Sequence, residues 1–203
     1  MVRVLLVSII LLSATLNSPA QVPFRVVSWN LLNFSDNDGD RLPYIQTVLD
    51  EIQPDIILAQ EMLDEEGCDS VLTVLGPDFA RAEFIDGFDT DNAMFYRTST
   101  VQLVSQDTIQ TALRDISEYV VWVGKLGIGN EVRLYTCHLK ASSGTTNEQK
   151  RLAEVTRLRE HLADLPDSVE WIIAGDMNFY DSDEPGYQKF MAAEGDGVNP
   201  ILS

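Results

Sequence analysis

The chain has 203 residues, which is enough for one well-buried domain and short for two. Apolar residues make up 45% of the sequence and charged residues 23%, so the composition favours a folded globular protein over a disordered one. The 32 acidic and 14 basic residues give a net charge of −18, which argues against a broad electrostatic grip on nucleic-acid backbones. A nuclease is not excluded, because a bound cation and a few arginines can offset this charge locally.

Residues 1–20 differ in composition from the rest of the chain. Arg3 is the only charged residue among them, residues 4–12 are almost unbroken apolar sequence, and small residues lead up to Ala20. This three-part pattern predicts a secretory signal peptide that is cleaved after Ala20, so that the mature chain begins at Gln21. The apolar run is short for a bilayer span, so we expect no stable membrane insertion after cleavage and a secreted, periplasmic or cell-surface protein. A buried strand or an uncleaved anchor is the alternative.

The sequence contains two cysteines, Cys68 and Cys137. A disulfide is allowed in an exported protein. Cys137, however, lies in an apolar segment, where a buried free thiol is common. Both states stay open, because sequence does not show the geometry that a disulfide requires.

The chain opens with a predicted strand, helix and strand. The first strand is Arg25–Trp29, with the sequence RVVSW. Apolar residues at helical spacing then predict a helix over 42–52, with Asp40 as its cap. Pro54 ends this helix, and Ile56–Ala59 is a second buried strand.

The middle of the chain reads as a run of strands separated by glycine, asparagine and aspartate turns. The predicted strands cover residues 80–84, 92–96, 100–105, 118–124 and 131–139.

The last third of the chain returns to helices. Thr146 and Gln149 resemble a capping box that opens a long helix, which Pro166 ends. A buried strand over 171–174 and a short helix over 186–193 follow. Mixed strands with helices early and late in the chain predict an α/β (α+β) fold in which two packed sheets carry helices outside. We expect a single domain over residues 21–203.

Four of the apolar strands end in polar residues that can handle metal or phosphate: Asn30, Glu61, His138 and Asp176, with Asn178 two residues later. Residues two apart in an extended segment lie about 6–7 Å apart on the same side, so Asp176 and Asn178 can face one ligand. Mg²⁺ prefers oxygen ligands, which suits Glu61. Asp176 and Asn178 could orient an attacking water, and His138 could hydrogen-bond a phosphate oxygen.

Each of these residues also has a structural interpretation. Asn30 could form a turn, His138 could be a satisfied core histidine, and Asp176 with Asn178 could form an ordinary turn. Glu61 could cap a short following helix, although Asp64 is better placed for that role. The sequence contains no clustered Cys/His ligands, no glycine-rich phosphate loop and no G-x-S-x-G, so zinc, nucleotide-hydrolysing and serine-esterase templates lack support.

Four segments in order, VVSWNLLNF, PDIILAQEM, YTCHLKASSG and WIIAGDMNFY, together resemble the endonuclease/exonuclease/phosphatase family, the superfamily of DNase I, exonuclease III and the neutral sphingomyelinases. The resemblance runs from about Arg25 to the last residue. It implies a four-layer αββα sandwich of two mixed sheets flanked by helices. No single segment is decisive, but the ordered set is highly specific.

The resemblance implies roles for the same polar residues. Asn30 and Glu61 match metal-binding and phosphate-orienting positions of the family, and His138 matches its first catalytic histidine. Asp176 and Asn178 match a pair that positions the nucleophile and the transition state.

Arg114, in the segment TALRDISEYV, resembles more weakly an arginine that reaches the substrate phosphate in DNase-like members. Pairing of Arg114 with Asp115 or Glu118 is an equally good interpretation.

The end of the sequence departs from the family pattern. Members close with a further aspartate and then an Asp-His pair, and no residue after Asn178 matches that pair. We therefore expect the domain to be incomplete at its C-terminus, with the final strands missing and the fragment itself inactive. The other charged groups have simple interpretations: His161, Arg151, Arg157 and Arg159 as a solvated helix face, and Asp36, Asp38 and Asp40 as a solvated acidic loop rather than a calcium loop.

The sequence as a whole predicts a secreted, monomeric hydrolase that cleaves phosphodiesters by attack of water, with Mg²⁺ or Mn²⁺ as cofactor and Ca²⁺ as an alternative. Its first predicted substrate is nucleic acid, with the protein acting as an endonuclease on DNA or RNA. A lipid or small-molecule phosphodiesterase or phosphatase, similar to the sphingomyelinases, is the second interpretation. An inactive binding module on the same fold is the third.

Overall fold

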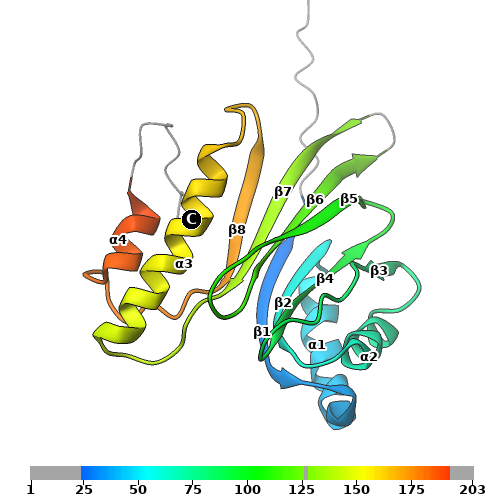
Figure 1. The fold of residues 1–203 in the computed structure, drawn as a ribbon. Helices are drawn as coiled ribbons and strands as arrows, with labels where there is room; N and C mark the ends of the chain where they lie inside the picture. Colours follow the sequence, from blue (N-terminus) through cyan, green and yellow to red (C-terminus); the bar gives the residue numbers. More distant parts are fainter. Residues whose placement is uncertain (1–23, 126–127, 193–203) are drawn as a thin grey trace, which may run out of the picture.

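A computed structural model describes residues 24–125 and 128–192 of the protein (Figure 1). The predicted signal peptide, the mature start at Gln21 and the expected incomplete C-terminus lie outside the described residues. Two four-stranded sheets lie face to face, with α1 and α2 on the outer side of one and α3 and α4 on the outer side of the other. The predicted αββα sandwich is confirmed.

The first sheet has the strand order β1-β2-β4-β3. β1 and β2 are parallel, and parallel neighbours require a crossover, which η1 and α1 provide. The other pairs are antiparallel. The elements are β1 (Val26–Phe34), η1 (Asp36–Arg41), α1 (Leu42–Ile52), β2 (Ile56–Met62), α2 (Glu65–Leu75), β3 (Phe79–Arg81) and β4 (Asp91–Arg97).

The second sheet has the order β5-β6-β7-β8, and its parallel pair is β7 and β8, joined through α3. Each sheet therefore contains one strand–helix–strand crossover, which places the carboxyl ends of two parallel strands at one edge of each sheet. The elements are β5 (Val101–Ile109), β6 (Ile116–Lys125), β7 (Ile128–His138), α3 (Thr145–Ala163), β8 (Glu170–Asp176) and α4 (Pro185–Met191).

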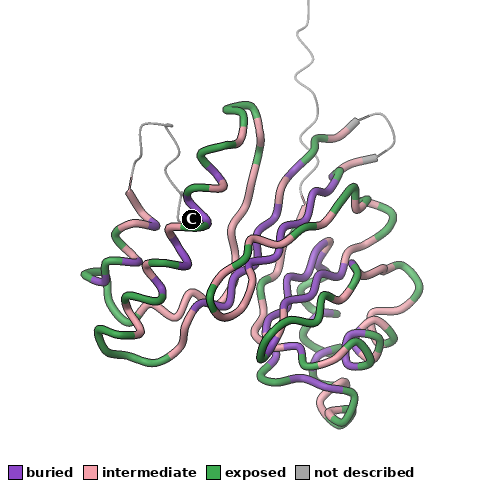
Figure 2. The backbone as a smooth tube through the Cα atoms, in the orientation of Figure 1, coloured by how far each residue is buried: buried purple, intermediate pink, exposed green. Residues whose placement is uncertain are grey.

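Three hydrophobic cores separate the four layers. Ile57 and Ala59 of β2 pack toward α1 and α2, whereas Ile56 and Leu58 pack toward the second sheet. The third core lies between the second sheet and α3, around Tyr135. A strand that is covered on both faces needs apolar residues at every position, which explains the unbroken IILA run of β2. Figure 2 shows this buried centre between more exposed helices.

Among the described strands, β1 and β8 are edges with one neighbour each, and they contact one another across the sandwich. The apolar residues 171–174 of β8 are all only half-buried, although they read as a buried run in sequence. In β2, by contrast, the apolar residues are fully buried. The side of the sandwich that carries β8 is thus less covered than the centre of the first sheet around β2.

Several local expectations differ from the structure. The capping box is wrong: α3 begins at Thr145 after Gly144, and no side chain caps it. The reason is that Gly144 has a positive φ of 98° and its carbonyl already accepts the amide of Asn147, so Thr146 lies inside the first turn. Residues 36–41, expected as an acidic loop, form a 3-10 helix capped by Ser35. The sequence indicates α2 only as a short helix after Glu61. In the structure α2 has 11 residues, and Asp64 caps it as expected.

Candidate active site

The site lies where the carboxyl ends of the two parallel strand pairs meet. In the second sheet His138 and Asp176 are direct partners in the β7–β8 register. In the first sheet the regular β1–β2 pairing ends at Asn30. Its partner on β2 is Gln60, the residue before Glu61. Because β1 and β8 contact each other, these two edges adjoin.

Asn30 joins the two sheets at this point. Its Nδ2 donates to Glu61 Oε1 at 2.7 Å and to Asp176 Oδ2 at 3.1 Å. Its Oδ1 accepts the backbone N–H of Leu32 at 2.9 Å, so the amide nitrogen and not the oxygen faces the carboxylates. In this geometry Asn30 orients Glu61 and Asp176, whereas the sequence assigned it to the metal ligands.

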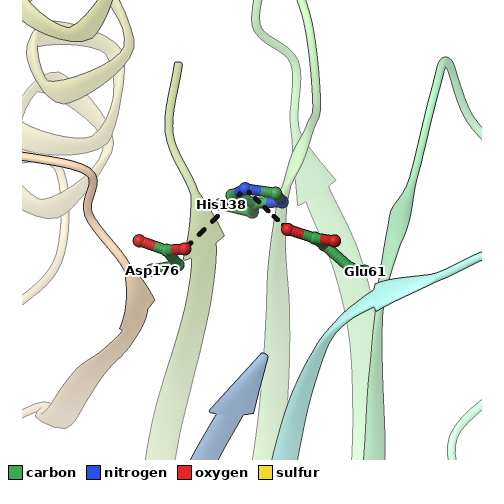
Figure 3. Close-up of side chains that lie close together, drawn as sticks. All are labelled: Glu61, His138 and Asp176. Atoms are coloured by element: carbon green, nitrogen blue, oxygen red, sulfur yellow. Dashed lines mark ion pairs between the residues drawn. The ribbon is translucent and has the colours of Figure 1, made fainter. Parts of the chain in front are cut away.

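Glu61, His138 and Asp176 form one cluster. His138 lies between the two carboxylates, with its Nε2 at 3.6 Å from Glu61 Oε1 and 3.9 Å from Asp176 Oδ2 (Figure 3). One possible ligand atom from each residue lies within 4.8 Å of the other two. Two carboxylate oxygens and an imidazole nitrogen at this spacing fit a divalent cation, and they come from three segments far apart in the sequence.

His138 is a neutral group in this cluster near neutral pH. Burial lowers the pKa of His138, and the nearby Arg114 lowers it further, against the opposing effect of Glu61 and Asp176. Its Nδ1 is buried and has no hydrogen-bond partner among the described residues. A neutral imidazole can ligate a cation or hydrogen-bond a phosphate oxygen.

The backbone around the site adopts conformations that are rare for residues with a side chain. Leu32, Asn33, Glu61 and Asn178 have φ between 49° and 59°. Such left-handed positions cost about 1 kcal/mol or more each and are found where the surroundings fix them. The amide of Asn33 donates to Glu61 Oε2 at 3.0 Å, so the irregular end of β1 holds the Glu61 carboxylate in place.

Gly175 explains why the WIIAG run ends in glycine. A Cβ at this position would lie 2.0 Å from the carbonyl oxygen of Cys137, so any side chain would force β7 and β8 apart next to His138 and Asp176.

The side chain of Asn178 forms its hydrogen bond outside the Glu61–His138–Asp176 cluster. Its Nδ2 donates to the carbonyl of Leu139 at 3.1 Å, and its backbone N–H donates to Asp176 Oδ1 at 3.2 Å. Asn178 therefore orients Asp176 and ties the end of β8 to the residue that follows His138.

Arg114 lies behind His138. Its guanidinium pairs with Asp89 at 2.7 Å and makes longer contacts with the carbonyl oxygens of His138 and Leu139, at 3.4 and 3.5 Å. The suggested partners Asp115 and Glu118 are wrong: they accept instead from Thr111 and Arg133, respectively. Asp89 is 25 residues away, and only the fold brings it close.

The expected solvated helix face is wrong for two of its arginines. Arg151 and Arg159 are buried, because α4 and the segment before it cover this side of α3. His161 is one-third exposed and contacts Glu118 and the hydroxyl of Tyr135. Arg157 alone is solvent-exposed, as expected. The missed signal was the helical spacing, since Arg151 lies on the same stripe as Val155, Leu158 and Leu162.

The two cysteines are free and lie in different layers. Cys68, on α2, belongs to the core beneath the first sheet, and Cys137, on β7, belongs to the core beneath the second. The structure therefore contains no disulfide between them. Burial raises the pKa of Cys68 to about 12 and raises that of Cys137 further, which keeps both thiols protonated.

A cavity of about 1200 Å³ lies beside the site rather than around it. It is lined by loop residues 110–113 and by one side of α3 between Thr146 and Glu160, including Lys150 and Arg157. Leu113 and Glu154 belong to its wall, so the cavity ends next to Arg114. We place the chemistry at the cluster, because that is where the titratable groups converge.

Comparisons with known proteins agree with this architecture. The chain is 26% identical over 161 residues to human tyrosyl-DNA phosphodiesterase 2, and the match covers 78% of the chain and 42% of that protein. No family model matches the chain.

Solved structures share the fold at low identity. They include the human Nocturnin catalytic domain with bound sulfate anion (TM-score 0.65, 21% identity, 86% of this chain and 70% of that one). Others are an endonuclease/exonuclease/phosphatase family protein from Bacteroides thetaiotaomicron (0.60, 22%, 81% and 66%) and D. rerio TDP2 complexed with single strand DNA product (0.57, 21%, 77% and 61%).

The described residues thus have the DNase I-like fold of the endonuclease/exonuclease/phosphatase family, as the sequence motifs implied. The sequence is similar to that of human tyrosyl-DNA phosphodiesterase 2, and the match covers less than half the length of that protein. No helix in residues 24–125 and 128–192 is long and apolar enough to cross a membrane.

Proposed function

We propose that the protein hydrolyses phosphoesters at the Glu61–His138–Asp176 cluster with a divalent cation, Mg²⁺ or Mn²⁺, with Ca²⁺ as an alternative. The observation that carries this proposal is the convergence of the three ligand atoms within 4.8 Å. Carboxylate oxygens are the ligands that Mg²⁺ prefers, so Glu61 and Asp176 would hold it. When bound, the cation neutralises charge that develops on the phosphate.

The protein groups have separate tasks in this proposal. Asp176 belongs to the cluster, and its carboxylate can also orient the attacking water and accept its proton. The neutral imidazole of His138 donates a hydrogen bond to a phosphate oxygen. Asn30 and Asn178 fix the two carboxylates by the hydrogen bonds described above, which keeps the site ready before substrate binds.

Nucleic acid is the proposed substrate, with the protein acting as an endonuclease. The support is the sequence similarity to a protein named tyrosyl-DNA phosphodiesterase 2 and the fold shared with a TDP2 structure that holds a DNA product. The net charge of −18 restricts such binding to local contacts at the site. We further propose that the protein is exported and monomeric.

A lipid or small-molecule phosphodiester is the second candidate, and one observation favours it. Leu32 and Phe88 are 67% and 73% exposed. Leu32 lies in the irregular last part of β1, two residues after Asn30, and Phe88 precedes Asp89, the partner of Arg114. Exposed apolar side chains near a hydrolytic site suit a substrate with an apolar substituent.

A substrate panel distinguishes these candidates. The full-length protein, with residues 21–203 alone in parallel, would be assayed on plasmid DNA, RNA, a sphingomyelin vesicle and bis(p-nitrophenyl) phosphate. Each assay would contain either Mg²⁺ or EDTA. We expect chelator-sensitive hydrolysis by the full-length protein, fastest on nucleic acid, and loss of at least about 100-fold in His138→Gln. The absence of hydrolysis of every substrate would contradict the proposal and favour a binding module.

A further inference from the structure

Two loops leave the second sheet next to the candidate site. Residues 139–144 follow His138 at the end of β7, and residues 177–184 follow Asp176 at the end of β8. The first half of α3 lies against both loops, and a buried ion pair joins it to the second one. This pair consists of Arg151 of α3 and Glu184, which precedes α4; their side chains are 0% and 2% exposed.

The ion pair is bidentate. Arg151 Nε lies 2.8 Å from Glu184 Oε2, and its Nη2 lies 2.9 Å from Glu184 Oε1. Burial opposes ionisation of Glu184, but the guanidinium and the backbone N–H of Tyr180 outweigh this effect and lower the pKa of the carboxyl. The pair is therefore ionised at neutral pH.

The remaining nitrogen of the same guanidinium holds the first loop. Arg151 Nη1 donates to the carbonyl oxygens of Lys140 and Ser142, at 2.7 and 2.9 Å. One turn along α3, Glu154 accepts the backbone N–H of Lys140 at 2.9 Å. A single planar side chain thus contacts both loops at once, which an ammonium group cannot reproduce.

The second loop is folded around this pair. The backbone N–H of Tyr180 donates to Glu184 Oε1 at 2.8 Å, and the Tyr180 ring lies over the guanidinium at 5.3 Å from its centroid. Gly186 makes the approach possible: a Cβ there would lie 3.2 Å from the backbone of Leu152 and 3.1 Å from Phe179. Glu184 can reach Arg151 because α4 begins with this close contact to α3.

The loops are also joined at their other end, beside the site. The backbone N–H of Leu139 donates to the carbonyl of Asp176 at 2.9 Å, and Asn178 Nδ2 donates to the carbonyl of Leu139 at 3.1 Å. His138 and Asp176 are therefore followed along the two loops by two sets of cross-links, one directly beside the site and one farther from it at Arg151 and Glu184. Stability alone does not require the distal one to be an ion pair, because well-packed apolar residues often replace a buried ion pair without loss.

We propose that Arg151 and Glu184 are positioning residues, which set the separation of His138 and Asp176 by holding the two following loops together. This proposal rests on the phosphoesterase function proposed above. Replacing a residue that orients ligands or catalytic groups through hydrogen bonds typically lowers affinity or activity about 10–100-fold.

The test compares the same substitution at two sites on α3 in the full-length protein. Arg151→Lys keeps the charge and loses the planar contact with both loops, whereas Arg157→Lys changes an exposed arginine. At a temperature well below each melting transition, we expect Arg151→Lys to lower kcat for bis(p-nitrophenyl) phosphate about 10–100-fold with little change in KM. Arg157→Lys should leave both constants unchanged. A folded Arg151→Lys protein with kcat within about twofold of the wild type would overturn the proposal.

A second variant covers misfolding of the first. Glu184→Gln keeps the shape of the side chain, and we expect the same selective loss of kcat; an unchanged kcat would count against a positioning role. If the wild type hydrolyses nothing, the proposed function fails, and hydrogen exchange tests the cross-link separately. Faster exchange of the amides of both Lys140 and Tyr180 in Glu184→Gln supports coupled loops. Faster exchange of the Tyr180 amide alone would overturn the proposal that the pair couples the two loops.

Discussion

We expect Asp176→Asn to be at least as stable as the wild type without metal but less stable than the wild type in Mg²⁺. One oxygen of Asp176 and one of Glu61 lie within 4.8 Å, at which two unit charges repel by about 3.5 kcal/mol at an effective dielectric constant of about 20. The Asp176 side chain is 34% exposed, so screening by solvent lowers this to about 1–2 kcal/mol. Loss of the hydrogen bond from Asn30 costs about 1 kcal/mol. In EDTA, Asp176→Asn should therefore melt at the wild-type temperature or up to about 4 °C higher.

Mg²⁺ should invert this order. At about 100 times its dissociation constant, a ligand that binds only the folded state stabilises it by about 2.7 kcal/mol, which corresponds to about 5–10 °C for a chain of this size. The variant lacks a ligand and should gain much less. Thermal unfolding of both proteins in EDTA and in a MgCl₂ series measures the effect, with Asp183→Asn on an exposed loop position as the charge-matched control. Equal Mg²⁺ shifts for all three proteins, or a variant that melts several degrees below the wild type in EDTA, would refute the reasoning.

Three further outcomes are expected. Because burial and Arg114 lower the pKa of His138, the folded state binds fewer protons than the unfolded state as the pH falls below about 6.5, so metal-free wild type should lose stability relative to His138→Asn between about pH 7 and 5. Urea unfolding of both proteins at the two ends of this pH range measures their free energies of unfolding. A difference between the two proteins that does not change with pH would contradict the prediction. Cys68 and Cys137 should react with a thiol reagent only after unfolding, giving two thiols per chain without reductant, whereas none would indicate a disulfide. Mass spectrometry of protein recovered outside the cytoplasm should find Gln21 at its N-terminus; a retained Met1 would count against export.

The main features of the fold were predictable, because strands covered on both faces and amphipathic helices leave strong patterns. The continuous apolar run of β2 and the apolar stripe of α3 both predicted buried elements. The strand ends were less predictable. β1 and β2 continue beyond Trp29 and Ala59 through irregular pairing, and left-handed positions such as Glu61 leave no signal in residue type. Such conformations are imposed by tertiary contacts rather than by local preference.

The candidate site was predictable as a set of residues but not as a geometry. Parallel pairing explains why His138 and Asp176 meet, since both end neighbouring parallel strands. Sequence could not show that Asn30 turns its nitrogen toward the carboxylates, because this depends on the amide of Leu32. Nor could it distinguish Arg151 from a solvated arginine, because its partner Glu184 lies 33 residues away.

The central claim is that Glu61, His138 and Asp176 act together on a phosphoester with a divalent cation. The most direct measurement is the rate of bis(p-nitrophenyl) phosphate hydrolysis by the full-length protein as a function of Mg²⁺ concentration, for the wild type and for Glu61→Ala. We predict a saturable Mg²⁺ dependence in the wild type that EDTA abolishes. In Glu61→Ala we predict a loss of several kcal/mol of transition-state stabilisation with an intact melting transition, which is the effect of removing a charge-stabilising group. Full activity in excess chelator, or an unchanged rate in Glu61→Ala, would contradict the account.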